Sequence, residues 1–150
     1  MNRLKAFVSI VSFLVTAATA AESNATEISS EDTRIDLKVE RVIDGDTIVA
    51  DGRKIRLWGI NAPEKNEDYY QAAKLFLESL LKDGEVSCKL IDIDKYQREV
   101  MHCFSQGDDL GSLLVQVGLA EDFKTYSSGY YGFEQNKAKS KKIGMWSNRP

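Results

Sequence analysis

The alternation of apolar and polar residues predicts a small domain that begins with three short strands. Residues 35–43 alternate between the two classes, which is typical of a strand with one buried face. Two further apolar runs, residues 47–50 and 54–60, follow the turn sequences Asp44-Gly45-Asp46 and Asp51-Gly52. The pattern therefore predicts successive strands joined by tight turns.

The rest of the chain alternates between predicted helices and strands. Mostly apolar residues recur at helical spacing before Gly84, at Ala72, Leu75, Phe76, Ser79 and Leu80. Two more strands are predicted over residues 85–91 and 99–104, and two more helices over 110–117 and 133–142. This order predicts an α+β, mainly β fold, in which a meander of five strands forms an OB-type barrel with three helices.

The N-terminus has the pattern of an exported protein. Arg3 and Lys5 precede a short apolar run, and Ala18-Thr19-Ala20 supplies the small residues of a cleavage site. The run is shorter than the ~20 residues of a membrane span. We expect a signal peptide over 1–20, a disordered lead-in over 21–34 and one domain over 35–150. The mature protein is then secreted or periplasmic, with no membrane segment after cleavage.

Export changes how the two cysteines are interpreted, because disulfides form in oxidising compartments. Cys88 and Cys103 lie on the two strands predicted on either side of a polar turn. If this hairpin turns about Lys95-Tyr96, residue numbers on facing strands add to 191, as those of the two cysteines do. Opposed Cα atoms are then about 4.5–5.5 Å apart, within disulfide reach. Two buried free thiols are the alternative, and a bulge would change the register.

Composition limits the kinds of partner. The chain has 150 residues, with 20 Lys and Arg against 23 Asp and Glu, a formal net charge of −3. This balance of charges excludes a strongly basic protein that coats nucleic acid and a polybasic protein that binds membranes. Any polyanion must therefore be held by a local cluster of cations.

Carboxylates and arginines gather at predicted strand ends. Asp46 and Asn61 offer hard oxygen ligands that suit Ca²⁺ or Mg²⁺. Glu64 could activate a water molecule, and Arg56 and Arg98 could neutralise phosphate oxygens. Taken singly, these residues also fit a turn, a loop and surface cations. Together they supply what phosphodiester hydrolysis requires.

Five blocks in this order resemble the thermonuclease (staphylococcal-nuclease-like) family, in its exported bacterial branch. The blocks are Val42 to Thr47, Ile55 to Glu64, Asp94 to Arg98, Leu114 to Ala120 and Gly144 to Trp146. The resemblance implies a five-stranded barrel with three helices. It also implies Ca²⁺-dependent hydrolysis of DNA and RNA that breaks the P–O5′ bond and leaves 3′-phosphates.

The resemblance also implies a role for each matching residue. Arg56 and Arg98 match the arginines that hold the scissile phosphate, and Glu64 matches the carboxylate taken as general base. The positions that match ligands of one Ca²⁺ ion are Asp46, Asn61 and Ala62, the last through its backbone carbonyl. Lys95 and Tyr126 match positions that contact a terminal phosphate of bound nucleotide.

Two residues depart from the family pattern. Asn61 replaces the usual Asp, so a neutral carbonyl replaces a charged ligand and a roughly tenfold weaker Ca²⁺ site is expected. Gln97 replaces a Gly, so a turn that requires positive φ would be strained by ~1–2 kcal/mol, or Arg98 would be re-aimed.

These observations predict an exported nuclease that acts as a monomer on DNA and RNA, in single-stranded or flexible form. The first alternative is a catalytically weakened barrel that binds nucleic acid or protein, which the two departures favour. The second is an exported structural domain with a calcium-binding acidic face. The aromatic residues near the C-terminus could stack on bases or pack a helix on the barrel: Phe123, Tyr126, Tyr130 and Tyr131.

Overall fold

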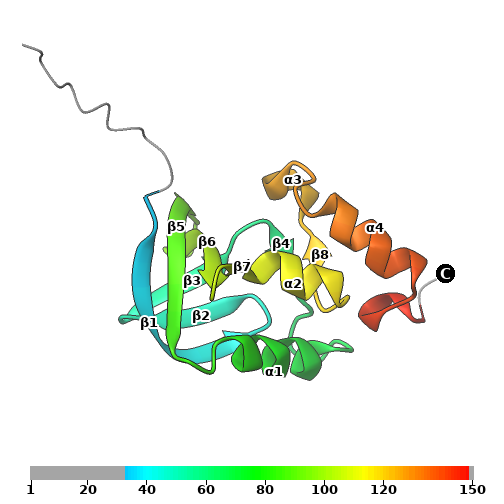
Figure 1. Ribbon diagram of the computed structural model, residues 1–150, viewed down its shortest axis with the longest axis horizontal. Coiled ribbons are helices and arrows are strands. Elements are labelled where there is room, and N and C mark those ends of the chain that lie inside the picture. The colour runs from blue at the N-terminus through cyan, green and yellow to red at the C-terminus, as the bar shows by residue number, and fades with distance from the viewer. Residues whose placement is uncertain (1–32, 149–150) are drawn as a thin grey trace, which may run out of the picture. The chain divides into compact units, whose positions relative to one another are not determined.

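A computed structural model describes residues 33–148 of the chain. The expected signal peptide and nearly all of the expected lead-in lie outside the described residues. The described part is built on a closed five-stranded barrel (Figure 1). The barrel strands are β1 (Ile35–Asp44), β2 (Thr47–Ala50), β3 (Arg53–Leu57), β5 (Glu85–Ile93) and β6 (Glu99–Ser105). The predicted fold class and OB-type barrel are confirmed.

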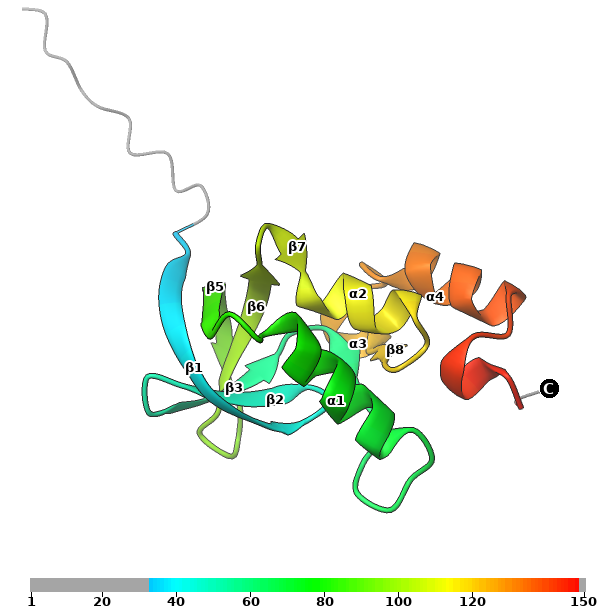
Figure 2. The same cartoon turned by 60° about the horizontal axis from the view of Figure 1, so that its bottom comes forward.

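The order of the strands differs from the predicted meander. The sheet runs β3-β2-β1-β5-β6, and a parallel pairing of β3 with β6 closes it. A helix, α1 (Tyr70–Leu80), follows β3 and packs against β1 (Figure 2). The chain therefore enters β5 at the free edge of β1, and β5 pairs with β1 and not with β3.

The predicted third strand is shorter than the apolar run of residues 54–60. It breaks at Gly59, whose φ of 73° lies in the left-handed region. A Cβ at this position would lie 3.0 Å from the Tyr131 ring, so the chain also passes close to a neighbour here. The residues beyond the break form β4 (Ile60–Asn61), which pairs with β8 (Glu121–Asp122) outside the barrel.

The three predicted helices are present, and the described part contains one more. They are α1, α2 (Leu110–Gln116) and α4 (Gly132–Ser140), and the additional helix is α3 (Lys124–Ser127). Four residues are too few to show a helical period, which is why the pattern missed α3. Two further short elements are the strand β7 (Asp108–Asp109), paired with β6, and a 3₁₀ turn over Gly144–Trp146.

The residues that α1 buries lie about one position along the chain from the residues predicted to be buried. Ala73 and Leu77 are completely buried, whereas Leu75 is 60% exposed. Phe76 and Leu80 from the predicted row pack against the core from its edge. The core fills the barrel and the space beneath the helices, and its completely buried side chains include Ile48, Ile55, Leu77, Met101, Leu110 and Leu114.

The predicted disulfide is present between β5 and β6. Cys88 and Cys103 are directly opposed, with Cα atoms 4.1 Å apart. The hairpin turn lies slightly later in the chain than predicted. Near the turn, the numbers of paired residues, such as Ile93 and Glu99, add to 192 rather than 191. A bulge after Leu90 restores the predicted register before the cysteines are reached. The predicted pairing of the cysteines was correct because the bulge cancels the effect of the later turn.

Candidate functional site

A buried carboxylate lies at the centre of the site. Asp46 follows Gly45 in the turn between β1 and β2 and is only 6% exposed. This turn packs closely, because a Cβ at Gly45 would lie 2.7 Å from the Cβ atoms of Ala62 and Ala73. The turn that carries Asp46 is therefore held against Ala62 and α1 by a close approach at Gly45 that only glycine permits.

The Asp46 carboxylate is bound by three donors, one of which is the Thr47 hydroxyl at 3.2 Å from Oδ1. The backbone N–H of Ala62 donates to Oδ2 of Asp46 at 2.7 Å, and Nη1 of Arg56 forms an ion pair with the same oxygen. Burial raises the pKa of Asp46 to about 6, and the Arg56 charge and the Ala62 N–H oppose this rise. The carboxylate therefore depends on positive charge beside it to stay ionised.

Arg56 connects Asp46 to β4. Its Nη2 donates to the backbone carbonyl of Ile60 at 3.1 Å and to Oδ1 of Asn61 at 3.3 Å. The β2–β3 register, which pairs Arg56 with Thr47, places the guanidinium beside Asp46. The structure thus brings together Asp46, Arg56, Asn61 and Ala62, four of the residues predicted from the sequence.

Arg98 lies directly before β6, the strand that pairs with β3. The parallel β3–β6 register pairs Arg56 with Val100, and Arg98 lies two residues before Val100. A cation on β3 and another directly before β6 offer a place where a phosphate can bind.

The Arg98 side chain is held by Asp94. Its Nε donates to Oδ2 of Asp94 at 2.6 Å, and the backbone N–H groups of Tyr96 and Arg98 donate to Oδ1. Although burial works in the opposite direction, these hydrogen bonds hold the pKa of Asp94 below its usual range. Gln97 has a φ of 61°, so this turn does require the left-handed conformation.

Glu64 lies on the loop after β4, and its side chain is exposed to solvent. Its backbone N–H donates to Oε2 of Glu67 at 2.7 Å, which turns the loop back toward α1. Pro63 is buried before it and limits the freedom of the loop. Glu64 thus projects from a restrained loop three residues after Asn61.

Comparison with protein families matches residues 54–148 to the family described as Staphylococcal nuclease homologue. The chain belongs to this family. The matched segment begins in β3 and includes every site residue named above except Asp46. The predicted resemblance and the predicted enzyme class, a nuclease, agree with this membership.

Three relatives show how far the similarity extends. The chain is 34% identical over 117 residues to an uncharacterized endonuclease of Escherichia coli O157:H7, covering 74% of this chain and 76% of the relative. It is 32% identical to the succinoglycan biosynthesis protein ExoI of Rhizobium meliloti, covering 73% and 63%. It is 27% identical to a micrococcal nuclease of Shigella flexneri, covering 74% and 73%.

The donor atoms of this nuclease-family site suit a hard cation such as Ca²⁺. The candidate ligands are the carboxylate of Asp46, the side-chain carbonyl of Asn61 and the backbone carbonyl of Ala62, all of them oxygen donors. The described residues contain no cluster of three or more His, Cys, Asp or Glu that could hold a metal ion. A cation here would therefore use amide and carbonyl oxygens and water besides one carboxylate.

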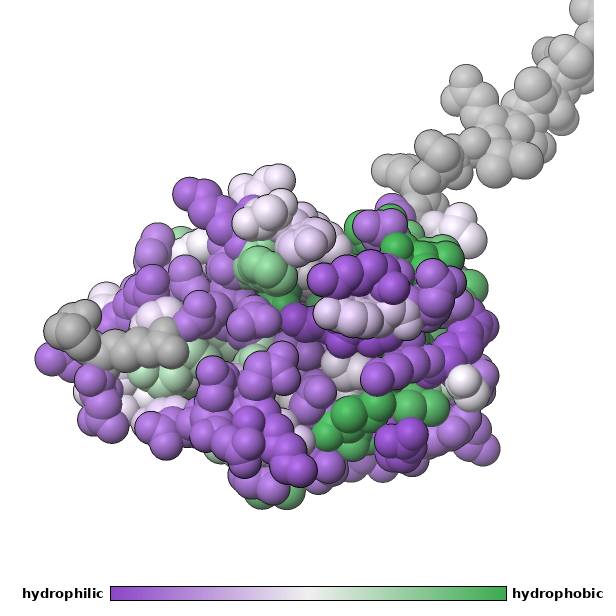
Figure 3. Space-filling view, turned by 180° about the vertical axis from the view of Figure 1, so that it is seen from behind, coloured by the Kyte–Doolittle hydropathy of each residue, from purple (hydrophilic) through white to green (hydrophobic). Residues whose placement is uncertain are grey.

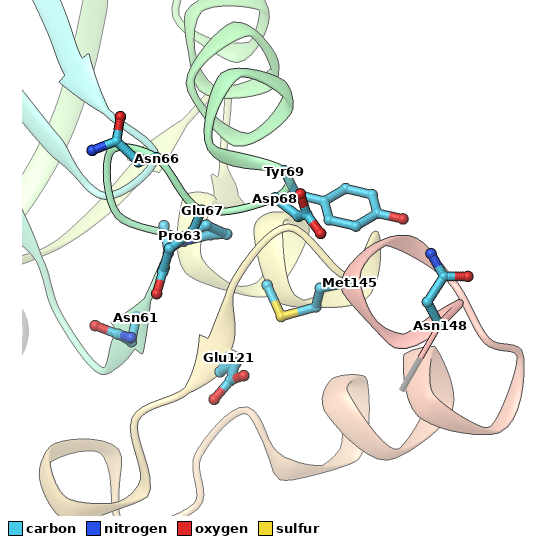
Figure 4. Close-up of a pocket in the computed structure, with 10 residues that line it drawn as sticks. Asn61, Pro63, Asn66, Glu67, Asp68, Tyr69, Glu121, Met145 and Asn148 are labelled. Atoms are coloured by element: carbon cyan, nitrogen blue, oxygen red, sulfur yellow. The ribbon is translucent and has the colours of Figure 1, made fainter. Parts of the chain in front are cut away.

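An open cavity of about 550 Å³ lies beside Asn61 and Ala62 (Figure 4). Its acidic lining includes Glu67 and Asp68 from the loop before α1 and Glu121 from β8. Glu121 is the direct cross-strand partner of Asn61. The cavity is thus a negatively charged opening next to the neutral Asn61.

The two expected nucleotide contacts lie on exposed positions. Lys95 is on the β5–β6 turn, with its Nζ 5.0 Å from the centre of the Tyr96 ring. Tyr126 is on α3, is 61% exposed and packs its ring against Phe123 at 4.7 Å. The backbone N–H of Phe123 donates to the Gly59 carbonyl, which ties α3 to the end of β3.

Sequence reasoning missed Asp94 and Glu121. Asp94 carries a local signal, since an Asp four residues before an Arg in a turn can bond both the backbone and the guanidinium. Glu121 carries no such signal, because its position beside Asn61 depends on a pairing between strands 60 residues apart.

Within residues 33–148, no helix is long and apolar enough to cross a membrane.

Proposed function

We propose that this chain is an exported, monomeric, Ca²⁺-dependent nuclease that hydrolyses phosphodiester bonds in DNA and RNA. The proposal includes cleavage of the P–O5′ bond, 3′-phosphate products and a single-stranded or flexible substrate. The observation that carries it is the cluster in which Arg56 contacts both the buried Asp46 and the exposed Asn61, with Arg98 directly before the adjacent strand β6. Membership of the nuclease family supports the same reaction.

Each residue has a role that its position permits. Arg56 and Arg98 bind the non-bridging phosphate oxygens and neutralise the charge that develops there. Glu64, exposed on its loop, accepts the proton of the water that attacks phosphorus. Asp46, Asn61 and Ala62 would hold the cation, which supplies further positive charge to the phosphate when bound.

The remaining proposed contacts lie around this centre. Lys95 and Tyr126 are exposed and could reach a terminal phosphate of the bound strand. The N-terminal pattern and the Cys88–Cys103 disulfide support export to the periplasm or the exterior. Figure 3 shows a rear face that is mostly hydrophilic with separate hydrophobic patches, which supports the proposed monomer.

A nuclease-like barrel that binds without cutting is the second candidate. Two observations favour it: Asn61 provides no charge to the cation, and Gln97 occupies a left-handed position just before Arg98. Such a protein would retain oligonucleotide binding that is insensitive to Ca²⁺ and would release no product.

The experiment that tests the proposal uses protein from Ala21 onward and a dye-labelled single-stranded DNA. Cleavage is measured with Ca²⁺, with Mg²⁺ and with EDTA, for wild type, Glu64→Ala and the control Glu78→Ala, which removes an exposed carboxylate from α1. We expect cleavage that requires Ca²⁺, a loss of at least about 100-fold in Glu64→Ala and no loss in the control. Cleavage that survives both EDTA and Glu64→Ala would refute the mechanism. Binding without cleavage at millimolar Ca²⁺ would favour the second candidate.

A further inference from the structure

The outward face of the barrel continues past the two arginines as a cluster of aromatic side chains. On β6, Met101 and Cys103 point into the core, whereas His102 and Phe104 lie half-buried on the outward side with Val100. Trp58 extends β3 by one position, because its backbone N–H donates to the Met101 carbonyl at 2.8 Å. This places Trp58 beside His102, with ring centres 5.1 Å apart.

Tyr130 completes the cluster from the segment between α3 and α4. Its ring meets Trp58 edge-on at 5.4 Å and His102 at 5.6 Å. The His102 and Phe104 rings are 4.5 Å apart. The four rings, Trp58, His102, Phe104 and Tyr130, are called the aromatic cluster below.

Packing of the C-terminal helices does not account for Tyr130. Its neighbour Tyr131 has that function: it is 1% exposed, and its hydroxyl donates to Asp109, which caps α2. Tyr130 is 59% exposed and adds little buried area to the core. His102 is held in place as well, with Nε2 2.7 Å from Oδ2 of Asp109. The cluster is therefore an ordered apolar surface that faces solvent at Tyr130.

Cations surround this surface. The Arg34 guanidinium lies 3.8 Å from the centre of the Phe104 ring, and Lys89 on β5 is the direct cross-strand partner of His102. Arg56 on β3 precedes Trp58 by two residues, and Arg98 lies directly before β6. Carboxylates balance these cations: Asp46 pairs with Arg56, Asp94 pairs with Arg98, Asp109 is bound to His102 and Asp92 lies opposite Val100. The rings therefore lie among paired charges, and stacking on the aromatic faces is what this surface offers a ligand.

We propose that the aromatic cluster binds unpaired nucleobases of a single strand whose phosphate is held by Arg56 and Arg98. This rests on the proposed nuclease function and adds a subsite to it. Arg56 and Trp58 are two residues apart, and two residues along a strand span about 7 Å. Trp58 therefore lies about 7 Å along the chain from the arginine that holds the phosphate. Bases within a duplex are already stacked on one another and cannot meet these rings, so the subsite selects single-stranded or locally opened nucleic acid.

Binding of two oligomers to a non-cleaving protein tests the subsite. The background is Glu64→Ala, and the labelled ligands are an oligothymidylate and an abasic oligomer of the same length, compared by fluorescence anisotropy. Tyr130→Ala removes the exposed ring, Tyr130→Phe keeps it, and Phe133→Ala is the control. Phe133 is 77% exposed on α4. Melting temperatures confirm that each variant is folded.

We expect Tyr130→Ala to bind the oligothymidylate about five- to tenfold more weakly and the abasic oligomer with unchanged affinity. Tyr130→Phe should bind both like the background protein, and so should Phe133→Ala. Equal affinity of the background protein for the two oligomers would overturn the proposal, as would equal effects of Tyr130→Ala and Phe133→Ala. If wild type cleaves DNA in the test above, such a result removes only the subsite. Failure to cleave and to bind either oligomer removes the proposed function with it.

Discussion

Arg56 makes most of the contacts in the candidate site. It pairs with Asp46, donates to the Ile60 carbonyl and donates to Asn61, so it holds the predicted cation ligands close together before any ion binds. The same contacts mean that a bound phosphate must compete with Asp46 and Asn61 for the guanidinium, whereas a bound cation must compete with the guanidinium for the oxygens of Asp46 and Asn61. Asn61 is therefore the position at which one side-chain charge should have the largest effect on cation binding.

The first prediction is that Asn61→Asp strengthens Ca²⁺ binding by about tenfold, because a charged ligand replaces a neutral carbonyl. Isothermal titration with Ca²⁺ measures this without any nucleic acid. Asn66→Asp is the control, since it adds the same charge on the exposed loop after Ala62 but is not in contact with Arg56. Equal gains in both variants would show that general charge, and not ligation by residue 61, sets the affinity.

The second prediction concerns the turn before Arg98. Gln97→Gly should raise the free energy of unfolding by up to about 1 kcal/mol, because glycine adopts a φ of 61° without steric cost. Gln71→Gly makes the same exchange on the exposed side of α1 and should lower stability by about 1 kcal/mol. Urea denaturation measures both. A destabilising effect at both positions would mean that Gln97 is not strained.

At the level of elements, the β5–β6 hairpin positions Arg98 and carries the disulfide. The bulge after Leu90 cancels the register shift that the later turn introduces, so Cys88 and Cys103 face one another. Arg98 lies between this turn and the start of β6. The same hairpin places His102 and Phe104 on the outward face. Its stability therefore affects both the phosphate site and the aromatic cluster.

The third prediction is that loss of the disulfide lowers the free energy of unfolding by about 3 kcal/mol, as expected for a closed loop of about 15 residues. Thermal denaturation with and without a reducing agent measures the change in wild type. The double variant Cys88→Ala/Cys103→Ala should not respond to the reductant. A two-dalton increase in mass on reduction confirms the bond, and its absence would refute the pairing.

For the whole molecule, the barrel holds one carboxylic acid in a buried position without enough positive charge to restore its ordinary pKa. Asp46 has a pKa of about 6 in the folded chain, against 3.8 for a solvated Asp. The folded state thus binds this proton more tightly than the unfolded state does. Between about pH 4 and pH 6 the unfolded state ionises first, so stability falls as pH rises through this window.

The fourth prediction is that wild type, measured in EDTA, loses up to about 3 kcal/mol from Asp46 between pH 4 and pH 6, relative to Asp46→Asn. The comparison with the variant removes the contributions of other acids, among them Asp94, whose lowered pKa acts in the opposite direction below about pH 4. Added Ca²⁺ should raise the melting temperature of wild type more at pH 7 than at pH 5. Parallel pH curves for the two proteins would contradict the assignment.

The sequence predicted those features that depend on residues close together in the chain. The cap of α2 is of the same local kind, since Oδ1 of Asp109 accepts from the N–H groups of Gly111 and Ser112. The ordered blocks around Asp46, Arg56 and Arg98 identified the family, and most of the strands followed from the alternation of apolar residues. The break at Gly59 was missed, because an apolar run continues across it.

Only the tertiary structure showed which residues are buried and which residues contact one another across the fold. The sequence around Asp46 is that of an ordinary turn, and its raised pKa depends on burial in a turn whose Gly45 packs against Ala62 and Ala73. Tyr130 and Tyr131 are adjacent and alike in sequence, yet one is exposed beside Trp58 and the other is buried against Asp109. Neighbours along the chain determine turns, caps and strand periodicity, whereas charge stabilisation and burial depend on side chains that meet only when the barrel closes.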